Sequence, residues 1–394
     1  MEKKLIMLPG PTNVPERVVN AMTKPIINHR SAEFHALYAE IEENLKYVFK
    51  TGNDVFVLTA SGTGGVECAV SNLINPGEKA IVPVFGTFSR RLAEKIRRRG
   101  GTPIELSIPL GTVPKAKYIK EILENEQDAT TAFIVCNETS TGVTVRELSE
   151  IGRITKENGM LLAVDAVSIL GGDELPVDDW NIDVCVTGSQ KCLACPPGLA
   201  LISVSEKAWE KIERTKNRPM YFDLLRMKES AAKNETPFTP AIPLFYALNE
   251  ALKMVREEGL TERFKRHKLC AEAFYTALES FQMTVFPREV ENRSNTVIAV
   301  NVPETLNGGK VREIMRNKYQ VLIADGMDEL KGKIFRIGCM GTVSQTETLT
   351  TLNALGKALK EAGFNVEIEK ALETARKVFN KTKTINQVTH ASLN

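Results

Sequence analysis

The chain has 394 residues, of which 43% are apolar and 25% are charged, and these proportions are typical of a soluble globular protein with two or three domains. Its 51 lysines and arginines nearly balance its 49 aspartates and glutamates, so the charge does not indicate nucleic-acid binding. No apolar run reaches about 18 residues, so no membrane span is expected. The apolar run near Met1 is too short for a signal peptide.

The seven cysteines are scattered and odd in number, which predicts a reducing, cytoplasmic location. Cys192 and Cys195 have the spacing of a redox or zinc pair. No second cysteine pair or nearby histidine completes such a site. We therefore interpret both as small residues that line a loop, and we expect no metal site.

Helical and strand patterns alternate through the first half of the chain. Residues 1–30 are expected to form an extended arm, because four prolines prevent a long helix there. Apolar periodicity predicts helices at 32–50, 66–73, 88–99, 118–125 and 146–158, and strands at 54–60, 80–84, 132–136, 161–165, 183–186 and 199–204. This alternation predicts an α/β fold with a mostly parallel sheet between helices.

The pattern changes in the second half. Prolines between 205 and 240 indicate an irregular crossing segment, and helices are expected at 243–258 and 261–281. A smaller α+β unit follows, with strands at 296–300, 321–323 and 334–337 and helices at 309–317, 345–362 and 368–379. We therefore predict a large domain over 31–281, a small C-terminal domain over 282–380 and a flexible tail over 381–394.

A glycine-rich turn, Ser61-Gly62-Thr63-Gly64-Gly65, follows the strand at 54–60 and precedes a helix. Such a turn can cradle a phosphate, because backbone N–H groups and the helix N-terminus attract an anion. It matches neither the G-x-G-x-x-G pattern of nicotinamide dehydrogenases nor the P-loop. A plain strand-to-helix connection is the alternative.

Other polar residues follow other strands, and ligands bind beyond the carboxyl ends of parallel strands. Asn137-Glu138-Thr139, Asp165 and Lys191 all occupy such positions. Asp165 alone could simply cap a helix, and a lone lysine is most often on the surface. A lysine held in a buried place, however, has a lowered pKa and can act as a nucleophile.

With Asp165 and Lys191 26 residues apart on successive strands, the sequence resembles fold-type I enzymes that use pyridoxal 5′-phosphate. It is most similar to the class V aminotransferases, in the branch of alanine–glyoxylate and serine–pyruvate or serine–glyoxylate aminotransferases. The similarity covers nearly the whole chain, from Pro9 to Gly338. The segments that carry it are Pro9-Gly10-Pro11-Thr12, Ser140-Thr141-Gly142-Val143, Val164-Asp165-Ala166, Ser189-Gln190-Lys191, Pro196-Pro197-Gly198 and Arg336-Ile337-Gly338.

The resemblance implies a role for each matching residue. Lys191 would form the internal Schiff base and then move the substrate proton. Asp165 would pair with the pyridine nitrogen and keep it protonated. The remaining cofactor contacts would come from Ser61, Gly62, Thr63 and Gln190 at the phosphate, Thr139 at the 3′-oxygen and Phe88 over the ring.

On the substrate side, the resemblance implies that Arg336 grips the α-carboxylate and that Gly10 lines the pocket. Taken alone, Phe88 could be a hydrophobic residue at a helix start, and Arg336 a surface charge. The family builds its sites at a homodimer interface, so Thr239 in the segment Phe238-Thr239-Pro240 would reach a neighbour's phosphate. The implied reaction passes an amino group from alanine or serine to glyoxylate or pyruvate in ping-pong half-reactions.

Three alternatives remain open. An acidic or phosphorylated donor, aspartate or phosphoserine, would need extra cations, which His29-Arg30 could supply. A cysteine desulfurase would usually carry histidines where this chain has Gln190 and Phe88. A non-enzymatic subunit would be free to lose Lys191, Asp165 or Arg336, and all three are present.

Overall fold

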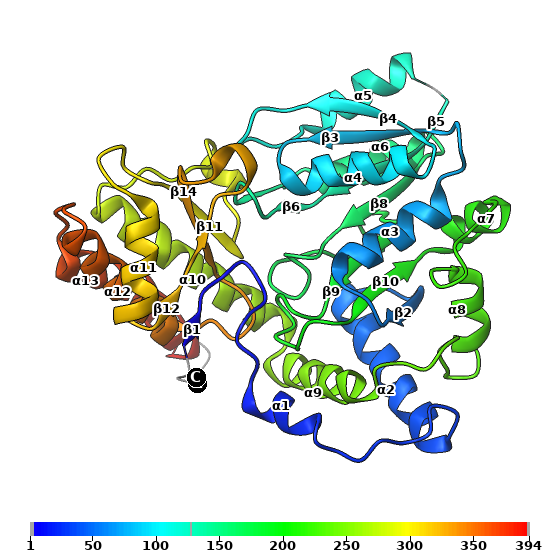
Figure 1. Cartoon of the computed structure of the whole chain (residues 1–394), viewed down its shortest axis with the longest axis horizontal. Helices are drawn as coiled ribbons and strands as arrows, with labels where there is room; N and C mark the ends of the chain where they lie inside the picture. Colours follow the sequence, from blue (N-terminus) through cyan, green and yellow to red (C-terminus); the bar gives the residue numbers. More distant parts are fainter. Residues whose placement is uncertain (1–3, 127, 392–394) are drawn as a thin grey trace.

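A sheet of seven strands forms the centre of the larger part of the molecule (Figure 1). The computed structural model describes residues 4–126 and 128–391. In spatial order the strands are β2 (Asp54–Leu58), β10 (Ala200–Val204), β9 (Val184–Gly188), β8 (Leu161–Asp165), β5 (Ala129–Val135), β3 (Lys79–Val84) and β4 (Thr102–Ser107). β10 runs antiparallel to both neighbours, and the other pairs are parallel. The prediction of a mostly parallel sheet is confirmed.

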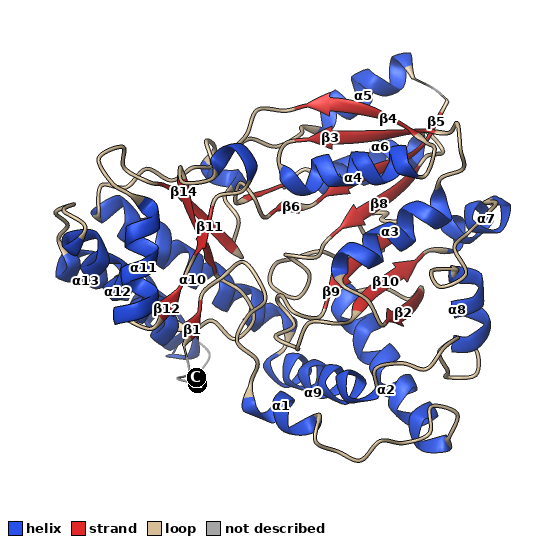
Figure 2. Cartoon of the chain, in the orientation of Figure 1, coloured by secondary structure: helices blue, strands red, loops and turns tan. Residues whose placement is uncertain are grey.

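Helices cover this sheet (Figure 2). Every residue of β9 and β10 is buried, as continuous apolar strands covered on both faces should be. The helices are α2 (Ala32–Phe49), α3 (Gly62–Leu73), α4 (Thr87–Arg98), α5 (Ala116–Asn125), α6 (Leu148–Glu157), α7 (Glu206–Arg214), α8 (Leu224–Ala231) and α9 (Ile242–Glu258). The expected elements of this half are therefore present, with ends shifted by a few residues.

Two local features differ from the expectation. Strand β4 went unpredicted because it lies at the edge of the sheet and all its residues are exposed or half-buried. Helix α3 begins at Gly62 rather than Val66, because Ser61 Oγ accepts the Gly64 N–H at 3.3 Å and caps it. The glycines thus lie in the first helical turn. A short hairpin of β6 (Asn137–Glu138) and β7 (Val143–Thr144) follows β5.

The C-terminal part has its own sheet, in the order β11 (Val297–Asn301), β14 (Ile334–Gly338) and β13 (Ala324–Asp325), with antiparallel pairing. Its helices are α10 (Leu260–Ser280), α11 (Gly308–Lys318), α12 (Gln345–Glu361) and α13 (Ile368–Ala391), with 3-10 turns η1 (Val290–Asn292) and η2 (Asp328–Leu330). These elements lie on the left of Figure 1. They share a second hydrophobic core that includes Phe274, Phe335 and Leu355.

The second core begins before residue 282, because Phe274 of α10 already belongs to it. The domain division near 282 stays a prediction. Helix α13 continues past its expected end at 379 to Ala391, and residues 392–394 of the predicted tail lie outside the described residues. None of the helices that the structure describes is both long and apolar enough to cross a membrane.

The N-terminal arm joins the two parts of the chain. Strand β1 (Leu5–Ile6) pairs in parallel with β12 (Val321–Leu322) of the C-terminal part. The arm is not extended throughout, because residues Glu16–Ala21 form the short helix α1, which lies beside α9 (Figure 1). Between them, the Thr12 N–H donates to Gln190 O at 3.2 Å. The arm therefore crosses the molecule next to the segment that carries Lys191.

Candidate active site

Lys191 lies three residues beyond β9, in a loop that hydrogen bonds hold in place. Ser189 Oγ donates to Pro196 O at 2.6 Å, and Thr12 Oγ1 donates to Lys191 O at 3.2 Å. The Lys191 ammonium donates to Pro9 O. The loop and the N-terminal arm thus fix both ends of the lysine.

Gly10 presses against the lysine side chain. A Cβ built on Gly10 would lie 2.5 Å from Cδ, 2.6 Å from Cε and 2.7 Å from Nζ of Lys191. Gly10 also has a φ of +102°, which side chains rarely tolerate. Both observations explain why glycine stands at this position, which the sequence analysis placed on the substrate side.

The pKa of Lys191 is lowered from 10.5 to about 8, mainly by burial and in part by the positive charge of Arg336, while Cys192 and Asp165 oppose the change. Desolvation disfavours an ammonium because its charge loses water. A substantial fraction of neutral amine is therefore present slightly above neutral pH, as a nucleophile or proton acceptor requires.

Asp165 ends β8, which is the parallel neighbour of β9, and it pairs in register with Val186. Its Oδ1 accepts the Val167 N–H at 3.0 Å. Burial raises the pKa of Asp165 to about 6, with a further contribution from Glu138, and the Val167 N–H, Lys95 and Lys191 oppose the rise. A cation placed against this carboxylate would restore its ordinary, ionised state.

A cavity of about 140 Å³ joins these groups. It brings together eight of the residues expected to hold a cofactor: Ser61, Gly62, Thr63, Phe88, Thr139, Asp165, Gln190 and Lys191. It is not the largest hollow, since one of about 870 Å³ opens elsewhere, beside α10. The smaller cavity is the better candidate because the perturbed lysine and carboxylate both line it.

One end of the cavity suits a phosphate. It lies at the N-terminus of the 12-residue helix α3, where the Ser61 and Thr63 side chains also line the wall. Gly62 is packed so closely that a Cβ would lie 2.9 Å from Val167. Gln190 Oε1 is buried and has no hydrogen-bond partner among the described residues. The residues present therefore fit a phosphorylated group such as pyridoxal phosphate.

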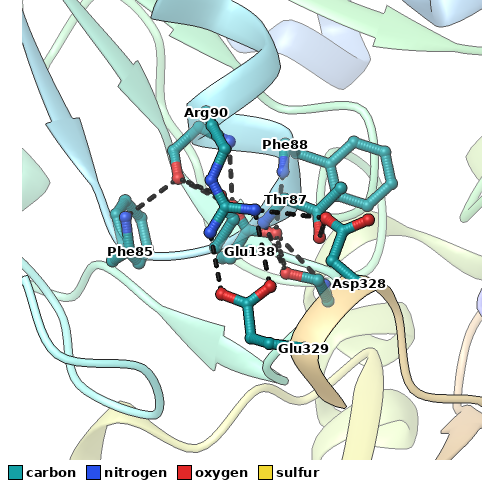
Figure 3. Close-up of polar contacts among 10 residues, drawn as sticks. Phe85, Thr87, Phe88, Arg90, Glu138, Asp328 and Glu329 are labelled. Atoms are coloured by element: carbon teal, nitrogen blue, oxygen red, sulfur yellow. Dashed lines mark hydrogen bonds and ion pairs between the residues drawn. The ribbon is translucent and has the colours of Figure 1, made fainter. Parts of the chain in front are cut away.

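Phe88 is held in the cavity wall by the buried carboxylate of Glu138 (Figure 3). Glu138 accepts the Phe88 N–H at 3.3 Å, the Ser89 N–H at 2.9 Å and the Ser89 hydroxyl at 3.0 Å. A carboxylate at a helix N-terminus is favourable because it faces the unpaired N–H groups. Glu138 thus positions the start of α4, a role that the sequence analysis did not assign.

Arg336 lies in β14 and is 9% exposed. Its Nε donates to Asp325 O at 2.7 Å and its Nη1 donates to Thr139 O at 3.3 Å. No carboxylate of the described residues lies within ion-pair distance of it. Burial lowers the pKa of Arg336 to about 10, against the charges of Asp325 and Glu138. A buried guanidinium without its own carboxylate is suited to bind one from a ligand.

Two cations in the cavity wall, Arg91 and Lys95, were not singled out from the sequence. Both point from α4, and their spacing of four residues places them on one helix face with Phe88. That face could have been recognised once Phe88 was assigned to the cofactor. Burial lowers the pKa of Lys95, while Asp165 and Glu67 oppose the change.

Gly10 and Arg336 do not line the cavity themselves, but they contact Lys191 and Thr139, which do. Two other residues named from the sequence lie farther from it. Thr239 lines a separate hollow with Thr59 and Tyr221, so within one chain it does not meet Lys191. Arg30 donates to Glu235 at 2.7 Å and to Thr236 O at 2.8 Å, and these bonds occupy it away from the cavity. Among the described residues, no cluster of metal-ligating side chains occurs, and the seven cysteines are free and buried.

Known proteins are similar to this chain over most of its length. The family model "Aminotransferase class-V" matches residues 6–331. An uncharacterized aminotransferase of Methanocaldococcus jannaschii is 45% identical over 96% of this chain and 98% of its own length. A protein named "Soluble hydrogenase, small subunit" of a Synechococcus strain is 37% identical over 92% of this chain and 94% of its own.

A solved structure leads to the same family. The alanine–glyoxylate aminotransferase of a Nostoc species is 30% identical and covers 91% of this chain and 96% of its own, with a TM-score of 0.88. These matches extend over both parts of the fold and over the cavity. The chain therefore belongs to the class V aminotransferases, enzymes whose cofactor is pyridoxal 5′-phosphate.

Proposed function

We propose that the protein transfers an amino group from a small amino acid, alanine or serine, to glyoxylate or pyruvate. The single observation that carries this proposal is a cavity lined by Lys191 and Asp165, with Arg336 bonded to its wall at Thr139 O. It supplies an amine, an anion for a cationic ring and a cation for a carboxylate. The name of the similar Nostoc enzyme supports alanine and glyoxylate as substrates.

Pyridoxal phosphate, when bound, supplies an electron-withdrawing ring that stabilises negative charge at the substrate α-carbon. Ser61, Gly62, Thr63 and Gln190 would hold its phosphate, Thr139 its 3′-oxygen, and Phe88 its face. Asp165 would remain ionised opposite the ring nitrogen. Its Oδ1 is oriented by the Val167 N–H, which leaves the other oxygen for that contact.

Lys191 would carry the reacting proton on Nζ. Its pKa of about 8 lets the amine both accept and release a proton near neutral pH. Pro9 O and Gly10 border the amine, so its swing is confined to the side facing the cavity. Arg336 would bind the carboxylate of either substrate and so orient both half-reactions alike.

The active unit is proposed to be a homodimer in which Thr239 reaches the phosphate bound by the neighbouring chain. The separation of Thr239 from Lys191 within one chain supports this arrangement. A cytoplasmic location also stays a prediction.

The name of the Synechococcus relative favours one competing function, that of a subunit of a soluble hydrogenase. The lowered pKa of Lys191 and the lack of a carboxylate partner for Arg336 both favour the enzyme. A subunit freed from catalysis has no need to bury two cations.

The test is the visible absorption spectrum of the protein reconstituted with pyridoxal phosphate. We expect alanine or serine to bleach the band of the bound cofactor, and glyoxylate or pyruvate to restore it. The Lys191→Ala protein should not complete this cycle. A band that no amino acid bleaches, with aspartate and phosphoserine included, would contradict the proposed reaction. A protein that binds no cofactor would support the subunit function.

A further inference from the structure

The start of helix α4 and the turn η2 come from distant parts of the chain and meet next to Phe88 (Figure 3). The N-terminus of α4 supplies Thr87 and Arg90, and the turn η2 supplies Asp328 and Glu329. Thr87 Oγ1 donates to Asp328 Oδ2 at 2.7 Å, and Arg90 Nη1 lies 3.3 Å from the same oxygen. Arg90 Nη2 donates to Glu329 Oε1 at 2.8 Å. We call these four residues the Arg90 latch.

On the α4 side, the latch is built onto a rigid base. Thr87 is buried, and its N–H donates to Ser140 Oγ at 2.9 Å. A Cβ on the preceding Gly86 would lie 2.4 Å from Glu138 Cγ and Cδ, so the chain is pressed against that carboxylate. Phe88, the next residue, lines the cofactor cavity. Movement of Thr87 would therefore move Phe88.

On the η2 side, the latch connects to Arg336 through Asp325. Asp325 O accepts Arg336 Nε at 2.7 Å, and Asp325 Oδ1 accepts the N–H groups of Gly326 and Gly332, each at 2.8 Å. These bonds close the segment 325–332 into a tight loop. The segment 325–332 therefore has two contacts: Asp325 O binds the Arg336 guanidinium, and the Arg90 latch binds the segment to α4.

We propose that the Arg90 latch sets the distance between the cofactor cavity and the Arg336 guanidinium, and so positions the substrate carboxylate. This inference rests on the proposed function. A substrate bound at its amino end to the cavity and at its carboxylate to Arg336 must span that distance. Thr87, Arg90, Asp328 and Glu329 are therefore positioning residues that touch neither substrate nor cofactor.

The position of the latch supports this role over that of a general stabilising contact. Its charged members are about half exposed, with side-chain exposures of 48%, 45% and 46% for Arg90, Asp328 and Glu329, and exposed pairs add little to stability. The hydrogen bond from Arg90 lowers the pKa of Glu329, so that carboxylate stays ionised at neutral pH. Asp328 holds a φ of +45°, an uncommon conformation for a residue that carries a side chain.

The test compares Arg90→Ala with Arg153→Ala. Arg153 is a matched control because it bonds Glu150 and Glu157 within helix α6 and is also about half exposed. For Arg90→Ala we expect the KM for the amino donor to rise about three- to tenfold, with kcat nearly unchanged. Arg90→Lys should recover part of the loss, and Arg153→Ala should match the native enzyme.

A double-mutant cycle identifies the partner. Asp328→Asn removes the charge but tolerates the left-handed backbone at this position. In Arg90→Ala/Asp328→Asn, KM should rise by less than the product of the two single effects. The same cycle is measured with Glu329→Gln, since Arg90 also bonds Glu329 at 2.8 Å. Additive effects in both cycles would show that Arg90 acts through other contacts and would overturn the latch.

Hydrogen–deuterium exchange of the cofactor-free protein supplies a readout that does not depend on the reaction. We expect faster exchange of the peptide covering 324–332 in Arg90→Ala and not in Arg153→Ala, while the affinity for pyridoxal phosphate stays within about twofold. Unchanged exchange would overturn the latch. Faster exchange with an unchanged KM would overturn its positioning role. A native protein without transaminase activity would contradict the proposed function, and the positioning role with it, while the exchange experiment would still decide whether the latch exists.

Discussion

Replacing Asp165 by asparagine should stabilise the cofactor-free protein while destroying its function. Burial raises the pKa of this carboxyl from 3.8 to about 6. At neutral pH the ionised carboxylate therefore lowers the free energy of unfolding. Asparagine keeps an oxygen that can accept the Val167 N–H. It removes the buried charge, which only a cationic ligand is expected to balance.

The size of the effect follows from the shift in pKa. A rise from 3.8 to about 6 corresponds to about 3 kcal/mol of stability lost at pH values above both. Because the amide must also be desolvated, we expect Asp165→Asn to raise the free energy of unfolding by about 1–3 kcal/mol at pH 7.5. The destabilisation by the native carboxylate decreases as the pH falls from 6 to 4, since the carboxyl is protonated at a higher pH in the folded protein than in the unfolded chain. The gain should therefore shrink over the same range.

The assay is urea unfolding of the cofactor-free proteins at several pH values between 5 and 8. Asp179→Asn serves as the control because Asp179 is exposed, and it should change little at any pH. With pyridoxal phosphate bound, the native protein should gain more stability than Asp165→Asn. If the cofactor-free Asp165→Asn protein is less stable than the native one at pH 7.5, the buried charge is already balanced within the chain and the reasoning fails.

Three further predictions concern the remaining site residues. Gly10→Ala should lower kcat more than tenfold, because its Cβ would lie within 2.7 Å of the Lys191 amine, on top of a backbone strain of about 1–3 kcal/mol. The control is Gly77→Ala, because Gly77 has a φ of +86° and lies in open space. This variant should lose a similar free energy of unfolding but keep the native kcat. If Gly10→Ala and Gly77→Ala have equal kcat values, the contact between residue 10 and Lys191 does not affect catalysis. Glu138→Gln should lower the free energy of unfolding by about 1–3 kcal/mol, because its amide N–H₂ group would face donors. Urea unfolding that shows the native free energy of unfolding for Glu138→Gln would contradict this prediction. Arg336→Lys should raise the KM for the amino donor roughly tenfold through loss of bidentate binding, and a steady-state titration that shows an unchanged KM would remove Arg336 from the substrate site.

The sequence alone was enough to predict six of the seven strands of the central sheet and, through its resemblance to a family, the cofactor. Strand β8 is an apolar run that ends in Asp165, and β9 begins with three apolar residues and is followed by Lys191 three residues beyond its end. Both signals are local, because the period of a strand or helix is encoded within a few residues. Strand β4 was not predicted, because its position at the sheet edge leaves its side chains exposed or half-buried. The start of α3 was placed four residues late because glycines within a first turn look like a loop.

Only the tertiary structure decided which distant residues meet. The Gly10 arm folds against Lys191, 181 positions later; Arg336 donates to Thr139 O across 197 residues; and Thr87 meets Asp328 across 241. Periodicity reports which face of an element is buried but not which other element covers it. The order of strands, the insertion of antiparallel β10 and the pairing of β1 with β12 depend on how all the apolar faces are buried together. The sequence determined the groups that this enzyme uses, and the packing of its two parts determined the distances between them.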